Sequence, residues 1–486
     1  MNPYEGRGTT RLGPSPDVDT GHEPRPGSTP ARDGRPFLLL DKLYGDAAMA
    51  GIFSESSSIE RWLQVERALA KAQLAHGVLS EREQREVESA ARPANLDAEQ
   101  LWADARNVGY PILPLVRQVS GRKHSSQTAS QIHYGATTQD IMDTALALQL
   151  RDAMDRLDGL LQRYGDAVAE LVVDHRDTIM AARTHGQQAV PTTFGAKMAV
   201  VLSEIDRHRT RASSVRSRVC LVSLYGGGGT SAALGPSAAR VRESMAVALG
   251  LDWREVPWHV SRDGTTELGL LCASITASVA RLAREVIDLS RTEIGEVSEA
   301  DGHHRGASST MPQKRNPVLS EAVIGFAGTS SALASGLLRT LEAGHERAAG
   351  EWQIEWQVLP QIICAAASAL ALGADIAGGM QVFPKVMRRN LNADAGLVMA
   401  EAYMMRLAPT LGRERAHDVV YTAARAARSA DRPLPDLLNE LLSDQADSSG
   451  SFDATPIAVE SYLGHTRTTC DIAVFDWRGN AGLGKS

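Results

Sequence analysis

The pattern of apolar and polar positions along the chain predicts a mostly helical protein. Residues 59–79 place Trp62, Val65 and Leu69 near helical spacing, with charged residues between them, which is typical of an amphipathic helix. A shorter, charged helix is expected at 80–91. The middle of the chain is more apolar, and the helices expected there span 141–175, 193–217, 237–249, 265–296, 320–341 and 351–373.

The longest of these helices need neighbours along their whole length. At 1.5 Å per residue they are rods on the order of 30–50 Å long. Small apolar side chains lie on several of their faces, and such helices gain most of their stability from packing against others. The pattern favours a long bundle that extends across subunits. The alternative is a monomeric bundle whose outer helices are polar.

Changes in composition divide the chain into four parts. Residues 1–35 are rich in Gly, Pro, Arg, Thr and Asp and nearly lack apolar side chains, which predicts a disordered tail. An N-terminal helical domain is expected at 36–140 and a central long-helix bundle at 141–380. From 381 to 486 the expected helices are shorter and interrupted by Gly, Pro and Ser, which predicts a small C-terminal helical domain.

Composition narrows the classes of function. Hydrophobic residues make up 43% of the chain and aromatic residues only 5%, which favours helix over strand. The net charge is −7, no basic block is present and the nearly apolar runs are short, so neither nucleic acid nor a membrane is an expected partner. The four cysteines form no CxxC pair, which argues against a disulfide scaffold or a zinc site and favours the cytoplasm.

The most informative stretch is 302–317, which reads GHHRGASSTMPQKRNP. Its glycines and its two hydroxyls, Ser308 and Ser309, indicate a loop that can close over a ligand. Lys314 can fix a carboxylate, and Asn316 can donate a hydrogen bond to an oxyanion. A polar surface loop without function is the alternative, because Ser and Gly are common in loops.

This stretch resembles the signature of the fumarase/aspartase superfamily, GSSxMPxKxNP, and departs from it only at Ala307. The resemblance implies that Ser308 is the base that takes a proton from the β-carbon of the substrate. Serine is a weak base in water, so loop amides and Lys314 are expected to stabilise its charged form.

A second segment, RTHGQQAVPTTFG at 183–195, resembles the Thr-His motif of the same superfamily. The resemblance implies that Thr184 contacts a substrate carboxylate and that His185 is an acid, base or relay group. It also implies that Glu321, five residues after Asn316, pairs with His185 and orients it. A lone histidine is more often a hydrogen-bonded core residue, and its coincidence with Glu321 favours the functional interpretation.

A third segment, HYGATTQD at 133–140, resembles the superfamily segment HxGxTSxD. Thr137, Thr138 and Gln139 offer neutral donors in a row, which bind charge at a small desolvation cost. Taken alone, the segment is typical of a helix N-terminus. Arg347 and the glycine-rich stretch 225–230 are weaker candidates for substrate contacts.

The resemblance extends over about residues 36–470. It implies a three-domain, mostly helical fold, a homotetramer whose central helices form a twenty-helix bundle, and active sites assembled from three subunits. It implies a small dicarboxylate substrate and neither a metal nor an organic cofactor. Some members of the superfamily are non-catalytic structural proteins, but those would be expected to lack the Ser, Lys or His of the segments.

Two branches of the superfamily are distinguished by the region after Arg347. Adenylosuccinate lyases need cationic anchors for a nucleotide phosphate, whereas this chain has Trp352, Gln353, Glu355 and Trp356 there. The same region looks like 3-carboxy-cis,cis-muconate cycloisomerases. That branch carries Trp at the position of His185 and a small Asn at the position of Tyr110.

This combination predicts a lyase that releases fumarate from a small 2-substituted succinate. The chain resembles nitrosuccinate lyases most, and a nitro group is planar and bidentate like a carboxylate. The resemblance implies 2-nitrosuccinate, which would give fumarate and nitrite, as the favoured substrate. Tyr110 is counted among the substrate contacts. Cycloisomerase chemistry, and C–N lyase chemistry on adenylosuccinate or another substituted succinate, are the alternatives.

Overall fold

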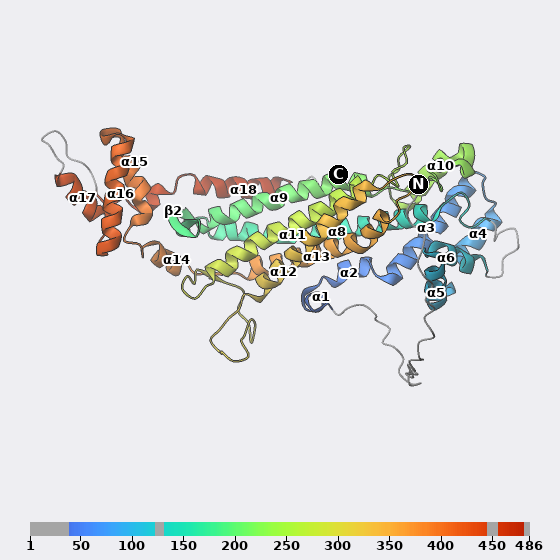
Figure 1. The fold of residues 1–486 in the computed structure, drawn as a ribbon, viewed down its shortest axis with the longest axis horizontal. Helices are drawn as coiled ribbons and strands as arrows, with labels where there is room; N and C mark the ends of the chain where they lie inside the picture. The colour runs from blue at the N-terminus through green and yellow to red at the C-terminus, as the bar shows by residue number, and fades with distance from the viewer. Residues whose placement is uncertain (1–37, 122–130, 445–454, 481–486) are drawn as a thin grey trace, which may run out of the picture. The chain divides into compact units, whose positions relative to one another are not determined.

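A computed structural model describes residues 38–121, 131–444 and 455–480. The predicted tail at 1–35 lies outside these residues. The described part is mostly helical, as the sequence predicted, and its strands are confined to two small two-stranded sheets (Figure 1). The boundaries proposed for the three domains stay a prediction.

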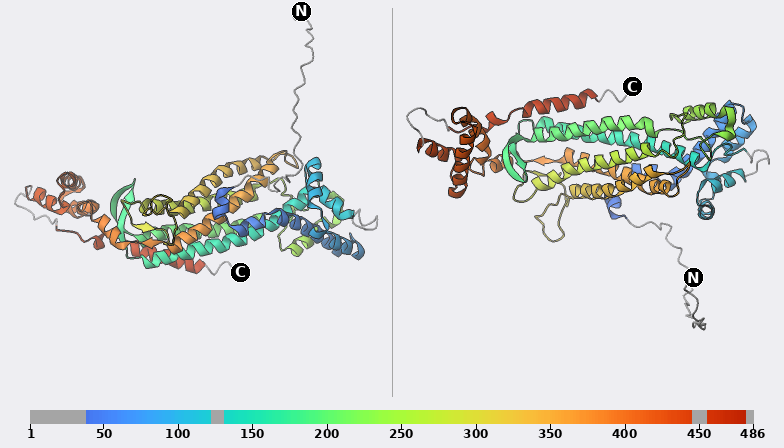
Figure 2. Two further views of the ribbon diagram at one scale, coloured as in Figure 1. Left: turned by 90° about the horizontal axis from the view of Figure 1, so that it is seen from below. Right: turned by 45° about the horizontal axis from the view of Figure 1, so that its top comes forward.

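Five long helices run side by side and form the central bundle (Figures 1 and 2). A sixth helix, α18, packs on α9 and α8. The bounds are α8 Thr138–Asp174, α9 Phe194–Val219, α11 Asp263–Leu289, α12 Val318–Leu338, α13 Glu351–Gly379 and α18 Thr466–Asn480.

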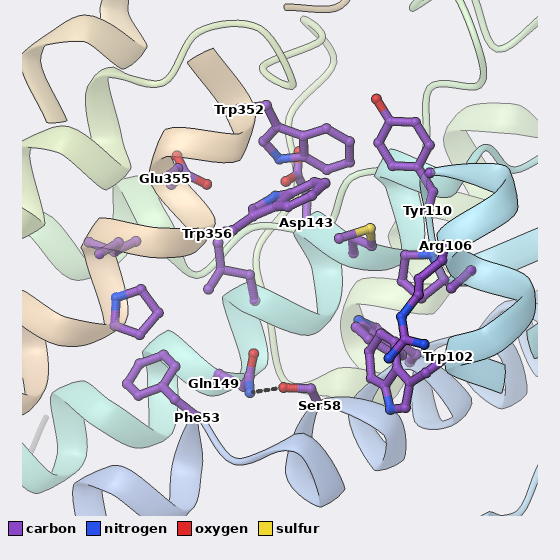
Figure 3. A pocket seen from close by; sticks show the side chains of 18 residues that line it. Phe53, Ser58, Trp102, Arg106, Tyr110, Asp143, Gln149, Trp352, Glu355 and Trp356 are labelled. Carbon is purple, nitrogen blue, oxygen red and sulfur yellow. Dashed lines mark hydrogen bonds between the residues drawn. The ribbon is translucent and has the colours of Figure 1, made fainter. Parts of the chain in front are cut away.

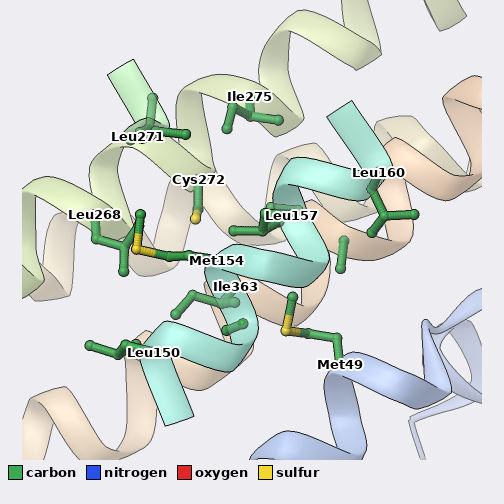
Figure 4. Packing of buried hydrophobic residues seen from close by; sticks show 14 of the residues in the cluster. Met49, Leu150, Met154, Leu157, Leu160, Leu268, Leu271, Cys272, Ile275 and Ile363 are labelled. Carbon is green, nitrogen blue, oxygen red and sulfur yellow. The ribbon is translucent and has the colours of Figure 1, made fainter. Parts of the chain in front are cut away.

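Apolar side chains from α8, α11 and α13 interlock in the middle of the bundle (Figure 4). Met154 and Leu157 of α8 lie against Cys272 of α11 and Ile363 of α13, and all four are almost fully buried. Met49 of α2 closes the same cluster. Close packing of this kind makes the bundle a rigid support for residues at its ends.

The helices of residues 39–120 and 232–249 form a group that packs on α8, chiefly through α3. The helix α10 packs on α3, and α3 packs on α8 and α4. The bounds are α1 Leu39–Tyr44, α2 Ala47–Ile52, α3 Glu55–Ala75, α4 Glu81–Ala90, η1 Pro93–Asn95, α5 Ala98–Val108, α6 Ile112–Ser120, η2 Ala232–Ser237 and α10 Ala238–Leu249.

The C-terminal helices form a second hydrophobic core, which includes Ala181 of β1. The helix α14 packs on β1, and η4 packs on β2. The bounds are α14 Pro384–Leu391, η4 Leu397–Met399, α15 Ala400–Leu411, α16 Arg413–Ala430, α17 Leu434–Asp444 and η5 Val459–Tyr462. The remaining short helix is η3 Arg339–Glu342.

The β-hairpin was not anticipated from the sequence. Strands β1 Ile179–Thr184 and β2 Gln187–Thr193 pair antiparallel, and His185 and Gly186 form the turn with positive φ angles of 52° and 76°. Two central residues with positive φ match the twist of paired strands. The second sheet joins β3 Val297–Ser298 to β4 Gln381–Val382, so α11 ends at Leu289, before the end predicted for it.

Within the described part of the chain, two helices are long and apolar enough to cross a membrane when judged by length and composition alone, namely the segments Val318–Glu342 and Glu351–Gly379. The short apolar runs in the sequence did not indicate this, because small residues separate the larger apolar ones. The apolar window of α13 is 72% buried within the bundle, which is typical of a core helix, whereas that of α12 is only 33% buried. The length criterion is therefore weak evidence for a membrane span.

Candidate active site

The three segments singled out in the sequence lie at two ends of the bundle. The helix α8 begins at Thr138 and ends at Asp174, and its 37 residues span about 55 Å at 1.5 Å per residue. The hairpin β1–β2 follows the far end of α8. Arg183 of β1 forms a bidentate ion pair with Glu296 (2.9 and 2.6 Å), just before β3 and the loop that carries Ser308. The hairpin and the loop therefore share one end, and residues 137–139 lie at the other.

The start of α8 is held by a buried carboxylate. Thr137 caps the helix and Thr138 is its first residue, and both are half-buried. The carboxylate of Asp140 accepts hydrogen bonds from the backbone N–H groups of Thr137 (3.0 Å), Tyr225 (2.9 Å) and Gly226 (2.9 Å). Burial raises the pKa of Asp140 despite these hydrogen bonds. Asp140 thereby holds the glycine-rich stretch beside the N-terminus of α8.

Arg347 meets two of the predicted site residues. Its guanidinium donates to Thr137 Oγ1 (3.1 Å) and to Gln139 Oε1 (3.2 Å). The Gln139 amide in turn donates to the carbonyl of His259 (2.7 Å), so this buried side chain orients Arg347. A guanidinium beside a helix N-terminus is a favourable place for a carboxylate.

Behind Gln139 lies a fully buried ion cluster that the sequence did not indicate. Arg262 donates to Asp143 (2.9 and 3.2 Å) and to Glu355 (3.0 Å from Nε). Thr265 donates to Glu355 (2.7 Å), and Gln139 donates to Asp143 (3.2 Å). The exposed fractions of the three charged side chains are 1–2%. The cluster carries two carboxylates for one guanidinium, so each carboxylate depends on Arg262.

We expect the folded protein to lose stability as pH rises because of Asp143. Burial raises the pKa of Asp143 to about 6 from the ordinary 3.8. Between these values the folded state binds a proton that the unfolded state releases, so the free energy of unfolding falls as pH rises through this window. Urea unfolding of Asp143→Asn should lack this component, on the order of 1–3 kcal/mol. Asp288→Asn, which alters an exposed aspartate of α11, should keep the wild-type slope.

A histidine–carboxylate pair lies beside the same helix start. Nδ1 of His133 is 2.6 Å from Oε1 of Glu66, and Glu66 is 2% exposed. Burial alone would lower the pKa of His133, but the carboxylates of Glu66 and Asp140 raise it. The sequence placed His133 in a motif without giving it a role. Its partner could not be found from spacing, because Glu66 is 67 residues away.

Tyr110 lies on the side of the ion cluster that faces α5. Gly109 ends α5 with a φ of 88°, a left-handed conformation that glycine adopts readily and that turns the chain at Tyr110. The Tyr110 ring stacks on Trp352, with 6.0 Å between ring centroids, and its hydroxyl accepts from the Gln353 amide (3.3 Å). These contacts fix Tyr110 against the start of α13, and no hydrogen bond between Tyr110 and Arg347 occurs among the described residues.

At the other end, the hairpin presents Thr184 and His185 to solvent. Thr184 ends β1, and His185 is the first residue of the turn. Both residues are exposed, and the ion pair of Arg183 with Glu296 holds the strand next to this turn. Within the described chain Glu321, at the start of α12, is also exposed and forms no ion pair with His185. The predicted pairing of His185 with Glu321 is not made inside one subunit.

The loop between β3 and α12 projects from the bundle (Figure 1). In this loop the Ser308 hydroxyl oxygen accepts hydrogen bonds from the backbone N–H groups of Thr310 (3.3 Å) and Met311 (3.2 Å). Ser308 is half-buried, whereas Ser309 is exposed. Two N–H donors aimed at one hydroxyl stabilise negative charge on that oxygen.

The base of the loop is rigid. Asn316 donates its backbone N–H (2.9 Å) and its side-chain amide (3.1 Å) to the carbonyl of Gly306. Gly306 has a φ of 65°, and a Cβ there would lie 2.4 Å from the Asn316 carbonyl, so only glycine fits. Ala307 and Arg315 form a β-bridge next to it. Lys314 is exposed on this turn and has no ion-pair partner among the described residues.

No group of three or more His, Cys, Asp or Glu side chains in the described ranges could hold a metal ion. The two ends of the bundle offer a hydroxyl that accepts two amide hydrogen bonds, a lysine, a histidine, and an arginine beside a helix N-terminus.

Comparisons with known proteins place this geometry in a family. A family model described as "Lyase" matches residues 45–329, which include all three segments. The chain belongs to this lyase family, within the fumarase/aspartase superfamily. A second model, "Adenylosuccinate lyase C-terminus", matches residues 396–471, in the part that forms the second core.

Individual members of the superfamily are similar over most of the chain. A 3-carboxy-cis,cis-muconate cycloisomerase of Pseudomonas aeruginosa is 36% identical over 90% of this chain and 95% of its own. An N-acetyl-S-(2-succino)cysteine lyase of Dickeya dadantii is 33% identical over 83% of this chain and 88% of its own. The crystal structure of the 3-carboxy-cis,cis-muconate lactonizing enzyme from Pseudomonas putida has a TM-score of 0.83, with 34% identity, and covers 91% of this chain and 100% of its own.

Proposed function

We propose that the protein is a lyase that eliminates a leaving group from C2 of a 2-substituted succinate and releases fumarate. The observation that carries the proposal is the pair of N–H bonds from Thr310 and Met311 to the Ser308 hydroxyl. A serine that removes a proton from carbon must carry negative charge on oxygen, and these donors stabilise such charge.

The anionic substrate needs donors at both of its carboxylates. Arg347, Thr137 and the N-terminus of α8 hold the first carboxylate, and Thr138 lies at the same helix start. Thr184 holds the second carboxylate from the tip of its hairpin. Ser308 takes the proton from C3, the C–H electron pair forms the C2=C3 bond, and the leaving group departs from C2 with the electrons of its bond.

Charge develops on the carboxylate next to C3 as the proton leaves. Lys314 and the Asn316 amide are the donors that stabilise it. His185, oriented by Glu321 of a neighbouring subunit, supplies or relays the proton that a basic leaving group requires. The side chain of Gln139 forms hydrogen bonds with Arg347 and with the carbonyl of His259, so its part in binding is to orient Arg347. A direct contact of Gln139 or of Tyr110 with the substrate remains a prediction.

Such a site needs more than one chain, because its parts lie about 55 Å apart along α8. The helix α12 presents a surface for association. Its exposed positions include Gly325, Gly328, Ala332 and Leu338, and Glu321 is the only charged residue on the helix. Small side chains let helices approach closely. We propose a homotetramer in which three subunits supply the three segments of each site.

Mixed tetramers should test this assembly. Ser308→Ala and His185→Asn each remove one segment's function, so each variant alone should be nearly inactive. After the two proteins are mixed, dissociated and reassembled, some sites should combine intact copies of both residues and recover a fraction of the wild-type activity. Native mass spectrometry of tagged subunits verifies exchange. Full exchange without recovered activity would contradict a shared site.

The leaving group on C2 distinguishes the candidate functions. The sequence favoured 2-nitrosuccinate, but the named relatives are cycloisomerases and a succinocysteine lyase, which support the alternatives better. Cycloisomerase chemistry on 3-carboxymuconate is the second candidate function, because those relatives cover 90% or more of this chain. The resemblance to the cycloisomerase branch fails at His185, where that branch carries Trp, and the exposed histidine on the hairpin favours elimination.

A panel of substrates distinguishes elimination from cycloisomerase chemistry. The purified protein is incubated with nitrosuccinate, aspartate, malate, argininosuccinate, adenylosuccinate, S-(2-succino)cysteine derivatives and 3-carboxymuconate. Fumarate is followed by absorbance, nitrite by a colorimetric assay, and lactone by chromatography. Fumarate from at least one substituted succinate is the expected result. Lactone from carboxymuconate with no fumarate from any succinate would replace elimination by the second candidate function.

A further inference from the structure

A large aromatic cavity lies beside the ion cluster, between α3, α5 and α13 (Figure 3). Its volume is about 670 Å³, within the range of pockets that hold drug-sized ligands. Neither the succinate part of the proposed substrate nor a nitro group needs this much space. Its aromatic walls are formed by Phe53, Trp62, Trp102, Tyr110, Trp352 and Trp356.

The aromatic rings are arranged as a box. Trp352 and Trp356 are four residues apart on α13, and therefore on one face, with 4.7 Å between ring centroids. Tyr110 stacks on Trp352 and meets Trp356 edge-on, at 6.0 Å in both cases. Trp102 packs edge-on against Trp62 (6.2 Å), and its indole N–H is used by Glu55 (2.7 Å). Rigid rings held in this way present flat apolar faces to a ligand.

The charged side chains around the cavity favour a ligand whose far end is anionic. Asp143 and Glu355 line the wall, but both are paired with Arg262, which leaves them little capacity for a ligand cation. Arg106 is the cation among the lining residues, and it forms no ion pair within the described ranges. Figure 3 shows its guanidinium near Trp102, across the cavity from Glu355.

The cavity adjoins the proposed carboxylate site. Asp143 lines the cavity and accepts a hydrogen bond from Gln139 (3.2 Å), and Gln139 accepts one from Arg347 (3.2 Å). One side chain, Gln139, therefore separates the cavity wall from the guanidinium that would hold the succinate part.

From this geometry we infer that the cavity receives the substituent on C2 of the substrate, and that this substituent has a flat apolar body ending in a single carboxylate. The inference rests on the proposed elimination. In that reaction Ser308 takes the C3 proton, the C2=C3 bond forms, and the substituent leaves from C2 with the bonding pair and is protonated. A nucleotide substituent is disfavoured, because the single positive charge of Arg106 cannot neutralise a phosphate dianion.

Binding of a matched series of thioethers tests the inference without requiring turnover. The probes are 2-(ethylthio)succinate, 2-(benzylthio)succinate and 2-(4-carboxybenzylthio)succinate, which share the succinate part and the sulfur linkage. Kd is measured by titration calorimetry on the full-length Ser308→Ala protein, in which elimination is blocked. We expect the benzyl probe to bind about 10-fold more tightly than the ethyl probe, because its ring is buried between aromatic walls. The carboxybenzyl probe should bind about 5-fold more tightly again, through Arg106.

Single changes in the cavity should remove these increments separately. In the Ser308→Ala background, Trp356→Ala should abolish the tighter binding of the benzyl probe and change the Kd of the ethyl probe by no more than about 2-fold. Trp356→Phe should retain most of the tighter binding of the benzyl probe. Adding Arg106→Met should abolish only the advantage of the carboxylate. Trp253→Ala, which alters a tryptophan outside the cavity, is the matched control and should change none of the ratios.

Equal Kd values for the ethyl and benzyl probes, or a benzyl advantage that survives Trp356→Ala, would overturn the inference. Failure of all three probes to bind would do the same, since the cavity would then not accept a succinate substituent. Failure of the proposed function has a different signature. In that case no member of the substrate panel yields fumarate, while the binding differences among the probes remain.

Discussion

Ser308→Ala should lower kcat at least ~10³-fold, a loss of about 4 kcal/mol of transition-state stabilisation. The reason is that the proton acceptor is lost, while Arg347, Thr137 and Thr184 still bind the substrate carboxylates. Substrate affinity should therefore change little. Steady-state kinetics with the best substrate of the panel give kcat, and calorimetry on the inactive variant gives Kd.

The neighbouring hydroxyl is the matched control. Ser309 lies in the same loop and is exposed, whereas Ser308 accepts the amide hydrogen bonds of Thr310 and Met311. Ser309→Ala should lower kcat by less than about 10-fold, because it removes no acceptor of the proton. Similar, small losses at both positions would remove Ser308 from the role of base.

Arg262→Gln should destabilise the folded protein by about 3–5 kcal/mol, because it leaves Asp143 and Glu355 buried without a counter-ion. Glutamine can donate one or two hydrogen bonds but cannot neutralise two carboxylates. Urea unfolding, followed by circular dichroism at a fixed protein concentration, measures the loss. Activity should also fall, because Asp143 supports Gln139 and, through it, Arg347.

An exposed ion pair between α9 and α11 provides the comparison. Arg218 forms a bidentate pair with Glu267 of α11 (2.6 Å for both bonds), and the two side chains are 40% and 48% exposed. Water screens this pair, so Arg218→Gln should destabilise the protein much less. Equal losses in the free energy of unfolding for the two variants would contradict the special contribution of Arg262 as a buried counter-ion.

Part of the candidate site could be predicted from the sequence, because the residues proposed to carry its chemistry lie in short continuous segments. The pattern around Ser308, Lys314 and Asn316 depends on neighbours within ten residues, and the structure shows that local contacts such as Asn316 with Gly306 shape this loop. The alternation of apolar residues likewise predicted the long helices, since a helix buries one face at a period of 3.6 residues. The hairpin at 179–193 was missed, because its turn requires positive φ angles at His185 and Gly186. Histidine rarely adopts a positive φ, so the sequence did not indicate a turn there.

The sequence by itself determined the helical class, the positions of the long helices and the three segments that carry the proposed chemistry. Only the tertiary structure decided that Arg262 joins Asp143 and Glu355, which are 119 and 93 residues away from it. It also decided that the helices α3, α5, α8 and α13, with the segments that connect them, enclose an aromatic cavity. The physical reason is that helix formation and turn chemistry depend on spacing along the chain, whereas buried charge pairing and cavity shape depend on which faces of distant helices pack together.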